Sequence, residues 1–218
     1  MIRVARLVAE KDLRIEARRR VALWQVLPFG VMALLLCGLA LGPRRAGHSG
    51  AGAGLYFVVM LLVALLLVTR SQAIEHRGGT RSSVATLGLD PAGVFLGKSV
   101  ALLVQLISMG LVLGVGAVVL LHVPAAGALA ALPGTILTLV GLAAAGTMYG
   151  AVTGSDGPTT LLSVTSLPAF APILIVGERL ASAAIVHGAT ARWWVLLGTV
   201  VAAYGGLGVT LYGVVEDL

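Results

Sequence analysis

Few side chains in this 218-residue chain have the type and spacing that catalytic or metal chemistry needs. Three histidines, His48, His122 and His187, fall in polar stretches between long apolar runs, and as a set they could ligate a metal or a haem iron. A nucleophilic dyad would need Ser155 of "TGSDG" to reach His187, but the charge distribution places these two residues on opposite sides of a membrane. Three unrelated loop histidines are the simpler interpretation.

Glu178, in "PILIVGERLASAAIVHG", is the acidic residue with the clearest functional reading. An acid at the outer end of a proline-broken apolar run could face a substrate path. Alternatively, Glu178 and Arg179 simply end a helix at the membrane interface. Both interpretations stay open from the sequence.

Motifs that would make the chain an enzyme are absent from the sequence. It contains no Walker A loop, no HExxH and no CxxC or CxxCH motif, so the usual ATP, zinc and covalent-haem sites are not expected. Its single cysteine, Cys37, cannot form an intrachain disulfide. We therefore expect neither catalysis nor a bound metal or cofactor on this chain.

The composition is that of a membrane protein. Hydrophobic residues make up 58% of the chain and charged residues 11%, against about a quarter charged in soluble domains. Six apolar runs, none containing Asp, Glu, Lys or Arg, are long enough to cross a hydrocarbon core as helices. The sequence predicts an all-α integral membrane protein with six transmembrane helices, at Val21–Leu41, Ala51–Val68, Ser99–Leu121, Leu129–Val152, Thr159–Val176 and Trp193–Val214.

The distribution of basic residues predicts how these spans are oriented in the membrane. Eleven of the 15 lie before the first span or in the interlude 70–98, and four lie on the other side: Arg44, Arg45, Arg179 and Arg192. The positive-inside rule then places both termini and the interlude in the cytoplasm. The same placement explains the net charge of +6 without a nucleic-acid partner. Residues 1–20 are expected to form a cytoplasmic or interfacial helix, and 21–218 a single six-span domain.

The interlude, "RSQAIEHRGGTRSSVATLGLDPAGVFLGK", contains residues that typically stop and start helices, in a regular order. The second span is expected to continue as helix from Arg70 and to stop at Gly78-Gly79. A short helix over 81–87 would present Val84 and Leu87, and Asp90-Pro91 would start the helix of the third span. This pattern predicts a cytoplasmic coupling segment that docks a partner through six residues: Glu75, Arg77, Gly79, Thr80, Val84 and Leu87.

Glycines at four-residue spacing indicate closely packed helices. They occur at Gly110/Gly114 in the third span and at Gly146/Gly150/Gly154 at the end of the fourth.

Four stretches carry a family resemblance: the basic lead "KDLRIEARRR", the whole interlude, "AAAGTMYGAV" and "TTLLSVTSLPAFAPILIVG". Together with the length and the six-span layout, they resemble the heme exporter protein B (CcmB) family. The chain departs from the family pattern at Thr69, Arg81 and Ser82, which bears on how a partner would dock.

The resemblance implies an ABC-2 type permease in the bacterial cytoplasmic (inner) membrane. ATP and Mg²⁺ would bind a separate CcmA-like ATPase, and haem would be a substrate rather than a resident cofactor. Further implied partners are a second permease copy, CcmC- and CcmD-like membrane subunits and the haem chaperone CcmE. Two other readings stay open: an ABC-2 permease for another amphiphile, such as a lipid or drug, and a membrane assembly scaffold that transports nothing.

Overall fold

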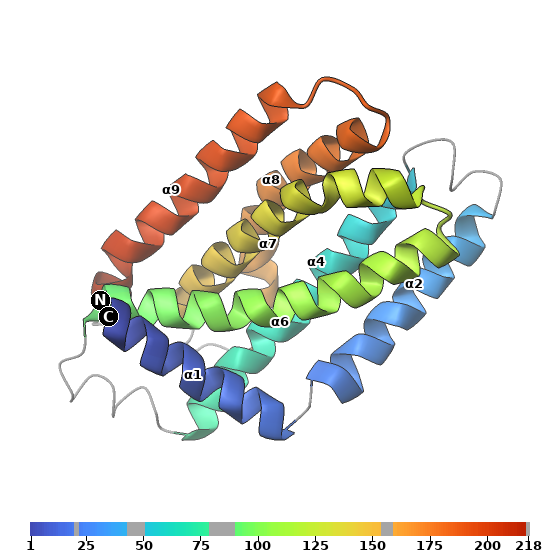
Figure 1. Ribbon diagram of the computed structural model, residues 1–218. Helices are drawn as coiled ribbons and strands as arrows, with labels where there is room; N and C mark the ends of the chain where they lie inside the picture. Colours follow the sequence, from blue (N-terminus) through green and yellow to red (C-terminus); the bar gives the residue numbers. More distant parts are fainter. Residues whose placement is uncertain (20–21, 43–50, 79–89, 154–158, 217–218) are drawn as a thin grey trace.

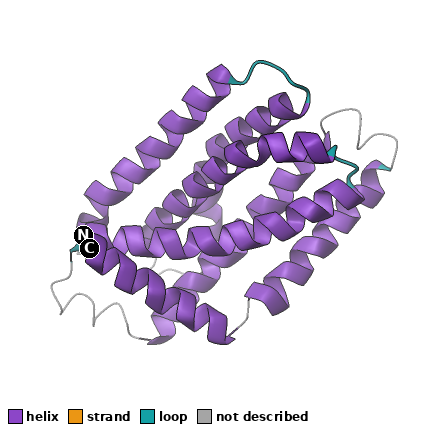
Figure 2. Cartoon of the chain, in the orientation of Figure 1, coloured by secondary structure: helices purple, strands orange, loops and turns teal. Residues whose placement is uncertain are grey.

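The computed structural model describes residues 1–19, 22–42, 51–78, 90–153 and 159–216. Within these ranges the chain is helical with short connections and has no strand, as Figure 2 shows. The elements are α1 (Ile2–Arg19), the π-helix η1 (Ala22–Val26), α2 (Leu27–Leu41), α4 (Ala51–Gly78), α6 (Pro91–Leu120), α7 (Ala125–Thr153), α8 (Thr159–Ile185) and α9 (Ala191–Glu216). The predicted all-α fold is confirmed.

Six of these helices are long and apolar enough to cross a membrane, which confirms the predicted number of spans. Their apolar stretches are Trp24–Leu41, Ala51–Gln72, Pro91–Leu120, Ala125–Ala151, Ser166–Ile185 and Ala191–Tyr212. The helices run further than the predicted spans, so the apolar stretches now take in charged residues that the sequence placed at or beyond the span ends. The five charged residues in these stretches are Arg70, Lys98, Glu178, Arg179 and Arg192.

The fifth span differs most from its prediction. Gly177 was expected to follow the helix end, but α8 continues to Ile185. Packing explains the difference, because a Cβ added at Gly177 would lie 2.3 Å from the Thr138 hydroxyl oxygen of α7. A glycine so close to a neighbouring helix supports tight helix packing here rather than a helix stop.

The helices form a bundle with two distinguishable ends (Figure 1). At the end that we call the terminal end, α1 and α6 begin and α9 finishes, and the Met1 amino group lies 3.2 Å from the Asp90 carboxylate. At the other end, which we call the far end, α2, α6 and α8 finish and α4, α7 and α9 begin. The α1 helix runs across the terminal end instead of continuing the line of α2.

The centre of the bundle depends on small residues of α7. A Cβ added at Gly146 would lie 2.6 Å from Val68 of α4, and one at Gly141 would lie 3.0 Å from Ile173 of α8. The side chains of Leu142 on α7 and of Phe170 and Ile173 on α8 are fully buried there. This confirms close packing at Gly146. Gly150 also packs closely, against Gln72, whereas Gly154 lies outside the described residues.

Candidate functional site

The predicted coupling segment is bounded by the helix stop and helix start expected from its sequence. The α4 helix ends at Gly78 and α6 begins at Pro91, both as predicted. Glu75 and Arg77 therefore lie in the last turns of α4. The other four predicted docking residues, Gly79, Thr80, Val84 and Leu87, fall in 79–89, outside the described residues, as do the departures Arg81 and Ser82.

Asp90 starts α6 without acting as a side-chain cap. Its backbone is extended, with φ −61° and ψ 112°, as an N-cap requires, but its carboxylate makes no capping hydrogen bond. The carboxylate instead pairs with the Met1 amino group. The start of α6 is thus joined to the start of α1.

Two glycines let α1 approach α6 to backbone contact. A Cβ added at Gly97 would lie 2.6 Å from the Ala5 carbonyl oxygen and 2.7 Å from Cβ of Val8. One added at Gly93 would lie 3.0 Å from the Met1 carbonyl oxygen. Because these atoms belong to the backbone or sit close to it, no flexible side chain can move aside. We call this contact the α1–α6 glycine seam.

Phe95 packs the start of α6 against α9. It is 1% exposed, and a Cβ added at Gly208 would lie 2.0 Å from its ring. The ring also packs against Tyr212 with centroids 5.6 Å apart, and the Lys98 ammonium donates a hydrogen bond to the Tyr212 hydroxyl over 3.0 Å. We call Phe95, Lys98, Gly208 and Tyr212 the Phe95 cluster.

The π-helix η1 is hydrogen-bonded to α4 at the terminal end. The Arg70 guanidinium donates a hydrogen bond to the side-chain carbonyl of Gln25. Thr69, one of the departures from the family pattern, donates to the carbonyl oxygens of Leu65 and Leu66 in its own helix. Its hydroxyl is therefore satisfied within α4.

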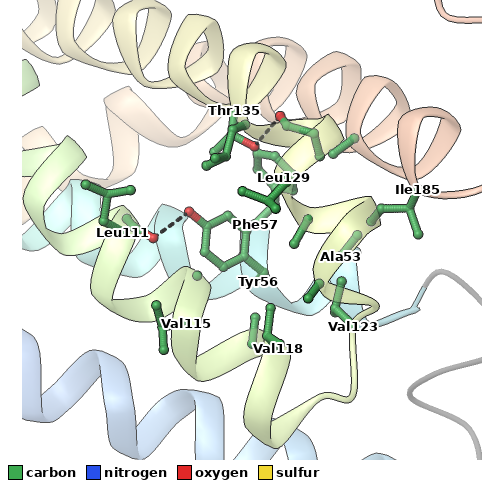
Figure 3. A pocket seen from close by; sticks show the side chains of 18 residues that line it. Ala53, Tyr56, Phe57, Leu111, Val115, Val118, Val123, Leu129, Thr135 and Ile185 are labelled. Atoms are coloured by element: carbon green, nitrogen blue, oxygen red, sulfur yellow. Dashed lines mark hydrogen bonds between the residues drawn. The ribbon is translucent and has the colours of Figure 1, made fainter.

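The far half of the bundle holds a cavity of about 340 Å³ (Figure 3). Its walls come from α4, α6, α7 and α8 and are almost wholly apolar. Its two polar side chains are already bonded, because Tyr56 donates to the Gly110 carbonyl oxygen over 3.1 Å and Thr135 donates to that of Ala131 over 3.0 Å. A Cβ added at Gly114, on the cavity wall, would meet no atom within 4 Å, so the close packing predicted at Gly114 is wrong.

Glu178 lies on α8 and is not part of the cavity wall. Its carboxylate accepts a 2.7 Å hydrogen bond from Ser182 and lies 3.6 Å from the Arg179 guanidinium. Its side chain is 25% exposed. That Glu178 faces a substrate therefore stays a prediction.

Of the three histidines considered as a metal set, His122 and His187 follow helix ends, and His48 lies outside the described residues. His187 follows α8 with a φ of 53°, and Gly188 donates its amide to the Ala183 carbonyl oxygen over 2.8 Å, which is a Schellman-type helix cap with His187 in the left-handed position. His122 follows α6 with a φ of 54°, and both side chains are exposed. Among the residues that the structure describes, no three acidic, histidine or cysteine side chains gather as a metal site.

Comparison with known proteins decides the family. The model of the CcmB protein family matches residues 3–210. The chain belongs to the CcmB family. Heme exporter protein B of Rhodobacter capsulatus is 28% identical over 179 residues, which cover 80% of this chain and 81% of that protein. This CcmB-family chain is thus a multi-pass membrane protein, and the likeness proposed from its motifs is confirmed.

Sequence reasoning missed the glycine seam and the Phe95 cluster. The spacing Gly93-x-x-x-Gly97 was visible in "GVFLG", but it lay in a stretch interpreted as a coupling segment rather than as a helix contact. Nothing local pairs Phe95 with Gly208, because 113 positions separate them. The two features show that the beginning of α6 is the point where α1, α6 and α9 meet.

Proposed function

We propose that this chain is the membrane permease subunit of an ABC transporter. ATP hydrolysis on a separate CcmA-like ATPase would be coupled through it to haem export, or to release of a haem-loaded chaperone. Membership of the CcmB family supports the class, and the name of the Rhodobacter protein supports haem as the cargo. In this arrangement the chain itself is not an enzyme, and ATP with Mg²⁺ binds the partner.

The observation that carries the coupling role is the reach of two helices. At 1.5 Å per residue, the 28 residues of α4 and the 30 of α6 are about 42 Å and 45 Å long, against a hydrocarbon core of about 30 Å. The excess of α4 is the polar stretch Arg70–Gly78 at the terminal end. A partner bound to 79–89 would therefore push on two helices that continue through the membrane.

The terminal end has the charge expected of a cytoplasmic face. Its exposed basic side chains on α1 are Arg3, Arg6, Lys11, Arg14 and Arg18, and Arg70 and Lys98 lie at the same end. The described basic residues of the far end are Arg179 and Arg192. This asymmetry supports an orientation with both termini in the cytoplasm of a bacterium and the chain in its inner membrane.

The remaining partners are proposed from the family alone. A second permease copy, CcmC- and CcmD-like membrane subunits and a CcmE-like haem chaperone would complete the assembly, with the lipid bilayer around it. Glu178 is retained as a substrate-facing residue, because it places a partly exposed carboxylate near the far end of a span.

Export of another amphiphile is the second candidate function. It is favoured by the apolar wall of the far-half cavity, which has no side chain that could ligate a haem iron or pair with a haem carboxylate. Soret absorbance of the purified complex, followed before and after ATP addition, separates the two. Haem that co-purifies and leaves on ATP turnover supports haem as cargo, whereas a complex that never carries haem supports the other amphiphile.

The docking assignment is tested by the same substitution at both ends of the bundle. Val84→Asp places a charge on the proposed apolar docking face, and Val186→Asp places one on an exposed valine just after α8. We expect Val84→Asp to abolish co-purification of the CcmA-like ATPase from native membranes, with membrane insertion unchanged. Val186→Asp should retain the ATPase. Undiminished co-purification with Val84→Asp contradicts the assignment.

A further inference from the structure

We propose that the far-half cavity binds one acyl chain of a membrane phospholipid, which enters sideways between α6 and α7. The inference goes beyond the proposed function, because it concerns a bound lipid whatever the cargo is. Four observations carry it: the chemistry of the wall, its opening, its depth and its unfilled volume.

The wall is suited to a hydrocarbon and to little else. Its residues on α6 and α7 are mainly Gly, Ala, Val and Leu, and it contains no charged, histidine, methionine or cysteine side chain. The Tyr56 and Thr135 hydroxyl groups are each bonded to a carbonyl oxygen of the chain (Figure 3). Haem would need a ligand for its iron and cations for its carboxylates, and this wall supplies neither. A chain of methylene groups needs no polar partner.

The opening faces the place where lipid lies. Three wall residues are largely exposed at the bundle surface: Leu111 (53%) and Val115 (68%) on α6, and Leu129 (67%) on α7. All three fall within the apolar stretches of their helices. At these three residues the cavity opens sideways, where the hydrocarbon core would lie.

The depth of the cavity matches one leaflet. On α6 its wall runs from Gly110 to Val118, and on α7 from Ala125 to Thr135. At 1.5 Å per residue these stretches span about 12 Å and 15 Å, and one leaflet of hydrocarbon is about 15 Å thick. An acyl chain of the leaflet at the far end would lie parallel to the wall over this whole depth.

An empty cavity of about 340 Å³ costs packing energy. Its lining atoms have no partners on one side and lose the dispersion contacts that close packing supplies elsewhere in the core. The surrounding side chains do not close it, because Gly114 has no atom within 4 Å of an added Cβ. A lipid chain restores those contacts without any change in the protein.

Filling the cavity tests the proposal. Gly114→Leu extends a side chain into the open space from a helical position where leucine is favourable. Gly198→Leu is the matched control, since an added Cβ there also meets nothing within 4 Å but lies on α9, away from the cavity. The full chain is reconstituted in phosphatidylethanolamine–phosphatidylglycerol vesicles containing a phospholipid with a diazirine in its acyl chain. After irradiation, labelled peptides are mapped by mass spectrometry.

In the native chain we expect the α6 and α7 wall peptides to be labelled several-fold more than the α9 peptide with Val195 and Leu196, which are exposed but line no part of the cavity. Gly114→Leu should reduce that excess to the level of α9, and Gly198→Leu should leave it unchanged. Equal labelling of wall and α9 in the native chain overturns the proposal without requiring any variant to fold. If the excess labelling of the wall survives Gly114→Leu, the proposal is also overturned. The same holds if a co-purifying protein chain covers the wall and prevents its labelling. Because Val84→Asp should not alter the labelling, failure of the docking assignment is distinguishable from failure of this one.

Discussion

Gly97 and Gly208 at the terminal end have surroundings opposite to those of Gly114 on the wall of the far-half cavity. At the terminal end, Gly97 and Gly208 leave no room for a methyl group, because neighbouring atoms lie 2.6 Å and 2.0 Å from where its carbon would be. In the far half, Gly114 faces open space. Both helix contacts at the terminal end are made by the first two turns of α6, directly after the proposed docking segment.

The difference indicates which part of the molecule moves as one piece. Close-packed interfaces have low compressibility and transmit displacement, whereas a region with unfilled volume can change shape at lower cost. A displacement of the start of α6 would therefore also displace α1 and α9, because both pack tightly against it. The wall of the far-half cavity, where we propose that a lipid chain fills the space, would be the part that deforms.

The largest expected effect is from removing the Phe95 ring. Phe95→Ala leaves a hole between α6 and α9 and is expected to lower the free energy of unfolding by about 3–5 kcal/mol. Phe29→Ala is the control, because Phe29 is 46% exposed on α2. Thermal unfolding in detergent can be followed by the reaction of Cys37, the single cysteine, with a thiol-reactive dye. Similar melting temperatures for the two variants would contradict the role assigned to the Phe95 cluster.

A methyl group added at each end should have opposite effects. Gly97→Ala forces α1 away from α6 and is expected to cost about 1–3 kcal/mol of stability. Gly114→Ala meets no atom and is expected to gain up to about 1 kcal/mol from the higher helix propensity of alanine. The dye-based melting curve measures both. A change of the same sign in the two variants would remove the contrast between the ends.

Removing a tyrosine hydroxyl should lower stability more at the terminal end than at the far-half cavity, and the difference should be smaller than those above. Tyr212→Phe removes the acceptor of a charged donor, Lys98, and is expected to cost about 1.5 kcal/mol. Tyr56→Phe removes a neutral hydrogen bond to Gly110 and is expected to cost about 0.5–1 kcal/mol. Denaturant titrations that rank the pair in the reverse order would show that Lys98 gains little from Tyr212.

Local signals in the sequence predicted what local physics decides. Apolar length gave the six spans, glycine marked the end of α4 at Gly78, and Asp90-Pro91 marked the start of α6. Local reasoning misled at Gly114, where the four-residue glycine spacing predicts close packing but an added Cβ would meet no atom within 4 Å. The Phe95–Gly208 contact and the cavity depend on how distant helices meet, and no short pattern encodes that. The docking residues within 79–89 stay predictions.

The sidedness and docking of the terminal end can be tested in one measurement. In a Cys37→Ser background, Ser83→Cys marks the proposed docking segment and Gly188→Cys marks the exposed turn after α8. Each is treated with a membrane-impermeant maleimide in sealed inverted and right-side-out vesicles, with and without the CcmA-like ATPase. We predict that Ser83→Cys reacts only in inverted vesicles and several-fold more slowly with the ATPase present, while Gly188→Cys reacts only in right-side-out vesicles. Reaction of Ser83→Cys from the outside, or ATPase protection of Gly188→Cys instead, would contradict the account.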